Sequence, residues 1–141
     1  MRVVGVDLGS RRIGVAVSDP SGTLATPYTV IRRGRDHVVD HEAIAAAVAE
    51  TGAQLVVVGL PLALSGRVEI AARRVLDEVE ELTAAVPVPV ECHDERLTTA
   101  SAERSLRSAG MDGVARRRVV DQVAAAVLLQ SWLDGRREGR T

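Results

Sequence analysis

Near its N-terminus the chain reads Val3-Val4-Gly5-Val6-Asp7-Leu8-Gly9-Ser10-Arg11-Arg12-Ile13-Gly14-Val15-Ala16-Val17. Two β-branched runs, residues 3–6 and 13–17, flank a short glycine-containing turn, and this pattern predicts a β-hairpin. Asp7 stands where the first predicted strand ends. A carboxylate at that position is placed to hold a metal ion or to face a phosphate. Asp7 is therefore the first candidate functional residue.

The rest of the chain predicts a mixed α/β fold. A third strand follows a turn of composition Asp19-Pro20-Ser21-Gly22, and helices and strands alternate after it. The expected later elements are a strand over 26–31, a helix over 40–50 closed by Gly52, a strand over 54–59, a helix over 69–85, a strand over 86–92, a helix from Thr98 or Thr99 to 109, and a helix over 116–134. Strands separated by helices favour parallel pairing, whereas the opening hairpins are antiparallel. We expect a mixed sheet covered by helices.

Helical spacing assigns several polar residues to outer faces. In the helix over 69–85 we expect Glu78 to lie outside the apolar stripe, and in the helix over 40–50 we expect Asp40 and His41 to lie off the side that packs. His37 and His41 have the four-residue spacing of zinc ligands, but the glutamate of a metalloprotease helix does not follow the first histidine, so we interpret both as solvated. We expect Cys92 to be a small core residue at a strand end.

The length and the hydrophobic content of the chain indicate one domain. With 141 residues, 46% of them hydrophobic, we expect a single domain over residues 1–135 and a polar tail over 136–141. The longest apolar runs are shorter than the roughly 20 residues of a membrane-spanning helix. The N-terminus lacks a signal-peptide pattern and the single cysteine cannot form an internal disulfide. The expected location is therefore the cytoplasm, without a membrane.

The net charge of the chain says less about its function than the positions of its arginines. A formal net charge of −1 argues against indiscriminate nucleic-acid binding through bulk charge. All eighteen basic residues are arginine, whose planar fork matches phosphate oxygens. The arginine clusters are Arg11-Arg12, Arg32-Arg33-Arg35, Arg73-Arg74, Arg116-Arg117-Arg118 and Arg136-Arg137-Arg140.

After Asp7, further acidic residues at the edges of predicted apolar elements are the second indication of a functional site. Asp94 and Glu95 follow the last predicted strand, and Asp121 shares a helical stripe with Ala125 and Leu128, which turns it toward the protein. A charge there requires a cation, a hydrogen-bonded partner or protonation. Carboxylates from separate elements suit hard cations such as Mg²⁺, and two such ions about 3.5–4 Å apart can activate a water and stabilise the leaving oxygen of a phosphodiester.

Each of these acids also has a purely structural interpretation. Asp7 can form a turn, and Glu95 can pair with its neighbour Arg96 on the surface. Asp121 can pair with Arg117 or Arg118 within its helix. Taken together, and in these contexts, the acids favour a metal site.

Four segments resemble, in the same order, the motifs of the YqgF/RuvX family, a branch of the RNase H-like nucleases. They are Asp7 to Asp19, Val58-Gly59-Leu60-Pro61-Leu62, Asp94-Glu95-Arg96-Leu97-Thr98-Thr99, and Arg118-Val119-Val120-Asp121-Gln122-Val123-Ala124-Ala125, and they cover nearly the whole chain. One segment departs from the family pattern: after Leu62 the family has polar Asn and Asp residues, whereas here Ala63-Leu64-Ser65-Gly66 stands, with Arg67 as a candidate replacement contact.

The resemblance implies an RNase H-like fold, with a mixed five-stranded sheet of three antiparallel strands followed by parallel strands, and helices on both faces. It implies that Asp7, Glu95 and Asp121 are the catalytic, metal-binding acids, with Mg²⁺ or Mn²⁺ as cofactor and two ions expected. The residues expected near the substrate are Arg11, its neighbour Arg12, Arg96, Thr98 and Thr99.

The resemblance also implies a function. The family is associated with processing the 5′ end of pre-16S ribosomal RNA and with cutting Holliday junctions. Nucleic acid is then the expected partner, with ribosomal subunit precursors for the first activity and a homodimer for the second. Two other classes stay open: a non-catalytic nucleic-acid-binding assembly factor, and an ATP-binding protein like the sugar kinases and actin relatives, which also begin with an Asp-Gly turn after a strand.

Overall fold

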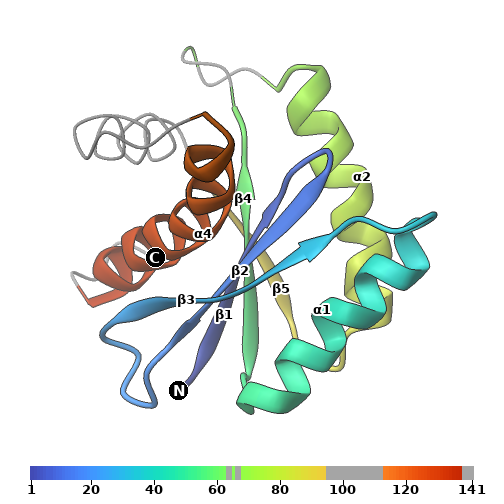
Figure 1. The fold of residues 1–141 in the computed structure, drawn as a ribbon. Coiled ribbons are helices and arrows are strands. Elements are labelled where there is room, and N and C mark those ends of the chain that lie inside the picture. The colour runs from blue at the N-terminus through green and yellow to red at the C-terminus, as the bar shows by residue number, and fades with distance from the viewer. Residues whose placement is uncertain (63–64, 66–67, 95–112, 138–141) are drawn as a thin grey trace.

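A single sheet organises the molecule. The computed structural model describes residues 1–62, 65, 68–94 and 113–137, and within the last helix the side chains of residues 123–136. The strands are β1 (Val3–Leu8), β2 (Arg12–Ser18), β3 (Ala25–Arg32), β4 (Leu55–Leu60) and β5 (Val90–Asp94), in the order β3-β2-β1-β4-β5 (Figure 1). β1, β2 and β3 pair antiparallel, and β4 and β5 continue the sheet in parallel from β1. The predicted mixed five-stranded sheet is confirmed.

Helices cover both faces of this sheet, as expected. α1 (His37–Thr51) and α2 (Ile70–Ala85) lie on one face, and α4 (Gly113–Arg137) lies on the other (Figure 1). α1 begins after Asp36, whose carboxylate accepts a hydrogen bond from the backbone N–H of Val39, and it ends at Gly52, which has a φ of 69°. The helix expected from Thr98 or Thr99 to residue 109 lies outside the described residues.

Strand alternation divides the core into two layers. In β1, Val4 and Val6 pack with Ile44 of α1, whereas Val3 packs with Leu129 of α4. A central strand buried on both faces requires an apolar residue at nearly every position, which explains its unbroken valine-rich sequence. No helix among the described residues is long and apolar enough to cross a membrane.

Gly5 sets how closely α4 approaches the sheet. A Cβ at this position would lie 2.7 Å from the Cβ of Leu129 and 3.2 Å from the carbonyl oxygen of Ala125. Only glycine therefore permits this contact between β1 and α4.

Several sequence-based expectations about side chains are wrong. Cys92 is exposed, because β5 is an edge strand of the sheet. Asp40, His41 and Glu78 are buried, at 2%, 3% and 6% exposure, although we expected them outside the packed faces. They can be buried because Arg33 pairs with both carboxylates and His41 contacts Glu78 in the layer between the sheet, α1 and α2.

Candidate functional site

Asp7 lies near the carboxyl end of β1, where it pairs in register with Gly14 of β2. It shares its strand face with Val3 and Gly5, so alternation places it on the side covered by α4. Its side chain is half-buried. The chain then turns sharply: the N–H of Gly9 donates to the carbonyl of Asp7, and a Cβ on Gly9 would lie 2.5 Å from the carbonyl oxygen of Arg12. The glycine therefore allows the tight turn that joins β1 to β2 and contains Arg11.

Asp121 belongs to the N-terminal half of α4. Ala125, one helical turn later, contacts Gly5 of β1. The backbone of Asp121 therefore lies about 6 Å along the helix axis from the contact between Ala125 and Gly5. Asp7 lies about 7 Å from Gly5 along β1. α4 begins at the end of the sheet where β4 ends, at the top of Figure 1. The backbone positions of Asp7 and Asp121 therefore lie on one face and toward one end of the sheet.

Hydrogen bonds fix α4 at both edges of the sheet. Gln130 accepts from the N–H of Ala25 at 2.9 Å and donates to the carbonyl of Thr23 at 2.9 Å. On the opposite edge, the indole N–H of Trp132 donates to Glu91 at 3.2 Å. These bonds hold the helix that carries Asp121 in one position over the sheet.

Glu95, the third predicted metal ligand, comes directly after Asp94 at the end of β5. Asp94 is the last residue of that strand and pairs with Leu60 of β4. It therefore lies at the same end of the sheet as Asp7, about 10 Å away across two strand spacings. Alternation places Asp94 with Val90, on the face of α1 and α2 and not on the face of Asp7. Glu95, Arg96, Thr98 and Thr99 come directly after it and lie outside the described residues.

Arginines surround a surface hollow next to the turn after Asp7. The hollow has a volume of about 680 Å³ and is lined by Ser10, Arg11, Arg12, Val30, Arg32 and Arg33. Arg12 at the start of β2 pairs in register with Arg32 at the end of β3, and Arg11 and Arg32 are exposed. The family resemblance implied Arg11 and Arg12 as substrate contacts, and the antiparallel register places Arg32, from a different arginine cluster, opposite Arg12. The hollow is a cationic surface suited to phosphates.

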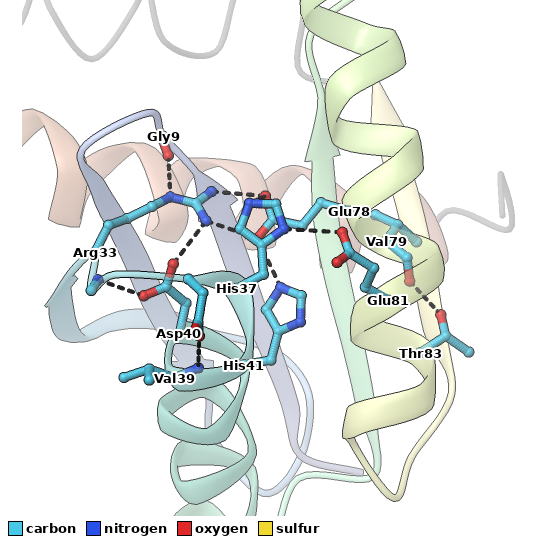
Figure 2. A network of polar contacts seen from close by, with 12 residues as sticks. Gly9, Arg33, His37, Val39, Asp40, His41, Glu78, Val79, Glu81 and Thr83 are labelled. Atoms are coloured by element: carbon cyan, nitrogen blue, oxygen red, sulfur yellow. Dashed lines mark hydrogen bonds and ion pairs between the residues drawn. The ribbon is translucent and has the colours of Figure 1, made fainter.

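A second polar cluster lies on the other face of the sheet (Figure 2). Glu78 of α2 accepts hydrogen bonds from Arg33 at 2.8 and 2.9 Å, and its Oε2 lies 2.8 Å from Nε2 of His41. Burial raises the pKa of Glu78, but the hydrogen bonds from Arg33 and then His41 outweigh it, so the pKa is lowered overall. The sequence carried a signal for this position: residue 78 falls three after Val75 and four before Leu82, both on the buried stripe.

Comparisons with known proteins identify the family of this chain. The sequence profile of the family described as "RuvX: Holliday junction resolvase" matches residues 1–135. The chain belongs to the RuvX family. A "Putative pre-16S rRNA nuclease" of Mycobacterium ulcerans (strain Agy99) is 50% identical to this RuvX-family chain over 139 residues, which is 96% of the chain and 80% of the relative. The protein of the same description from Mycolicibacterium smegmatis is also 50% identical over 139 residues, covering 96% of the chain and 82% of the relative.

The solved structures confirm the fold expected for a RuvX-family chain. "T. thermophilus RuvC in complex with Holliday junction substrate" superposes with a TM-score of 0.59 at 19% identity, over 99% of this chain and 97% of that one. "Thermus thermophilus RuvC structure" gives a TM-score of 0.57 at 18% identity. The RNase H-like fold is thus confirmed, and family membership confirms the prediction of a nuclease, an enzyme that hydrolyses phosphodiester bonds.

Proposed function

We propose that this chain processes the 5′ end of pre-16S rRNA as a divalent-metal-dependent nuclease. The observation that carries the proposal is the placement of Asp7 and the backbone of Asp121 on one face and toward one end of the sheet, next to a hollow lined by arginines. The name shared by the relatives at about 50% identity, pre-16S rRNA nuclease, supports the choice of substrate.

In this proposal the acids hold the cofactor. Asp7, Glu95 and Asp121 would be the ligands, and their all-oxygen donor set fits Mg²⁺ or Mn²⁺. Two bound ions would supply Lewis acidity to activate a water and to stabilise the leaving oxygen.

The arginines would position the substrate. Arg11, Arg12 and Arg32 would contact phosphates on either side of the scissile bond, and Arg96, Thr98 and Thr99 would add contacts from the segment after β5. Because bulk charge is close to neutral, binding would depend on this local surface. We expect the protein to act in the cytoplasm on ribosomal subunit precursors.

A paired cleavage assay tests the proposal. Wild type, Asp7→Asn, Glu95→Gln and Asp121→Asn would be incubated with a 5′-extended 16S rRNA fragment and, separately, with a four-way DNA junction, in Mg²⁺ or Mn²⁺. We expect wild type to cleave the RNA and not the junction, and each of the three acid variants to cleave the RNA on the order of 100-fold more slowly, since even outer partners of a metal ligand change activity by about 10–100-fold. Glu42→Gln, the same charge change at an exposed site of α1, is the matched control and should cleave normally.

The outcomes separate the alternatives. Cleavage of the junction but not of the RNA would replace the substrate with branched DNA, the activity in the family's description, and would make a symmetric homodimer the expected state. Binding of RNA without cleavage by wild type would instead favour a non-catalytic assembly factor. Equal cleavage by wild type and Asp7→Asn would rule out the proposed role of the acids.

A further inference from the structure

The cluster between α1 and α2 brings together metal-binding side chains that the nuclease site does not use. One ligand atom from each of His37, His41 and Glu78 lies within 4.8 Å of the other two. The two histidines come from successive turns of α1, and Glu78 comes from α2 across the helix–helix contact (Figure 2). Asp7 lies on the opposite face of the sheet, so this cluster is separate from the acids proposed for catalysis.

From this arrangement we propose that His37, His41 and Glu78 form a Zn²⁺ site that joins α1 to α2. Two imidazole nitrogens and one carboxylate oxygen are a common zinc donor set with one coordination position left for water. The same nitrogen donors disfavour Mg²⁺, which takes oxygen ligands, so the site would select a different metal from the one proposed for catalysis.

The buried members are already held in place. Arg33 binds both oxygens of Glu78, and Asp40 accepts a hydrogen bond from the same guanidinium at 3.1 Å. Outer partners of this kind orient ligating carboxylates in metal sites. Zinc ligands about 2.1 Å from the ion lie roughly 3.4 Å apart, so the 2.8 Å separation between His41 Nε2 and Glu78 Oε2 needs to widen by about half an ångström.

The local charge also favours a cation. The carboxylates of Asp40 and Glu78 pair with the guanidinium of Arg33, and a third carboxylate, that of Glu81, lies 3.0 Å from Nδ1 of His37. Arg74 and Asp77 also line the adjoining cavity and add one positive and one negative charge to it.

That cavity gives access to the site. It has a volume of about 500 Å³ and is lined in part by His37, Glu78 and Glu81, so an ion and its water can enter from solvent. His37 is the exposed member, with a side-chain exposure of 48%, whereas His41 and Glu78 are buried. Removal of His37 therefore deletes one ligand without opening the core.

Zinc titration of the whole protein tests the inference. We expect calorimetry to show one Zn²⁺ per wild-type chain and Co²⁺ to give the visible d–d absorption of a four-coordinate nitrogen–oxygen site. His37→Gln should weaken zinc binding at least tenfold, since even outer partners of a metal ligand change affinity by about 10–100-fold. His93→Gln is the matched control, because this third histidine contacts Ser131 on the α4 side of β5, and it should bind zinc as wild type does.

Asp7→Asn distinguishes this site from the catalytic acids and should also retain zinc. The inference is overturned if wild type shows no saturable Zn²⁺ binding. It is equally overturned if zinc binding is lost in Asp7→Asn and kept in His37→Gln, since the ion would then sit at the acids proposed for catalysis.

Discussion

The guanidinium of Arg33 donates to both carboxylate oxygens of Glu78, at 2.8 and 2.9 Å, and thereby links the end of β3 to the middle of α2. Arg33 also donates to the carbonyl of Gly9 at 2.8 Å. One side chain therefore connects the turn after Asp7 with the layer of α1 and α2. Its two acidic partners, Asp40 and Glu78, are almost fully buried.

Replacing Arg33 should destabilise the protein strongly. Arg33→Met leaves the carboxylates of Asp40 and Glu78 buried without their cation, and breaking a buried ion pair from one side costs about 3–5 kcal/mol. Urea unfolding monitored by circular dichroism would measure the change in the free energy of unfolding. Arg35→Met, at an exposed position two residues later, is the control and should change it by less than about 0.5 kcal/mol. A similar small change for Arg33→Met would contradict the role assigned to this residue.

Gly5→Ala should affect both stability and cleavage. The new Cβ would lie 2.7 Å from that of Leu129, so α4 must move away from β1, at a cost of about 1–3 kcal/mol. The shift would also displace the helix that carries Asp121 relative to Asp7, so RNA cleavage should fall under conditions where the variant is fully folded.

Gly135→Ala, a substitution within α4 itself, provides the matched control for Gly5→Ala. A Cβ at residue 135 meets nothing within 4 Å, and alanine is the better helix former. This variant should gain about 0.5–1 kcal/mol and cleave as wild type does. Unchanged stability of Gly5→Ala would show that α4 packs less tightly than the structure indicates.

The loop after β2 should make stability depend on pH in the acidic range. Hydrogen bonds from the backbone N–H of Leu24, the side chain of Ser21 and the backbone N–H of Thr23 lower the pKa of Asp19 from 3.8 to about 2. Because the pKa is lower in the folded state, the unfolded chain binds more protons over this range. The stabilisation from Asp19 is therefore complete above about pH 4 and disappears as the pH falls toward 2.

Asp19→Ala should consequently be less stable than wild type at pH 7, with a difference that shrinks between pH 4 and pH 2. Thermal unfolding at a series of pH values would measure it. Asp77→Ala, which removes one carboxylate at an exposed position of α2, controls for the loss of a negative charge outside this loop. A wild-type advantage that persists unchanged at pH 2 would be inconsistent with the hydrogen bonds of this loop.

The arginine hollow should determine how RNA binding depends on salt. If Arg11 and Arg32 each contact a phosphate, Arg11→Gln and Arg32→Gln should each reduce the slope of log affinity against log salt concentration by about 0.7–0.9. Fluorescence anisotropy with a labelled pre-16S fragment at several salt concentrations gives the slope. Arg136→Gln, whose guanidinium stacks on Trp132 at 5.3 Å, removes the same charge elsewhere and should leave the slope unchanged. A slope equal to that of wild type in both Arg11→Gln and Arg32→Gln would remove these two residues from the proposed interface.

Local sequence was sufficient to predict most of the sheet. β-branched runs separated by turn residues indicated β1, β2 and β3, and Gly52 marked the end of α1, because these signals act between neighbours in the chain. The position of Asp7 at a strand end followed from the same pattern. The pairing of Arg12 with Arg32 was not predicted, since it depends on the β2–β3 register, which shifts between Val15 and Ala16.

The polar cluster around Arg33 and Glu78 could not be predicted from the sequence, because it forms only in the folded chain. Arg33 and Glu78 are 45 residues apart in sequence, and Glu78 and His41 are 37 apart, so no local pattern relates them. An isolated glutamate on a helix is normally more stable in water, which is why we expected Glu78 outside. Its burial becomes favourable only when α2 packs against α1 and the folded chain brings the guanidinium of Arg33 and the ring of His41 to the same place. Chain-local chemistry thus specified the strands and the acid at the end of β1, whereas packing between distant elements determined which charges lie inside.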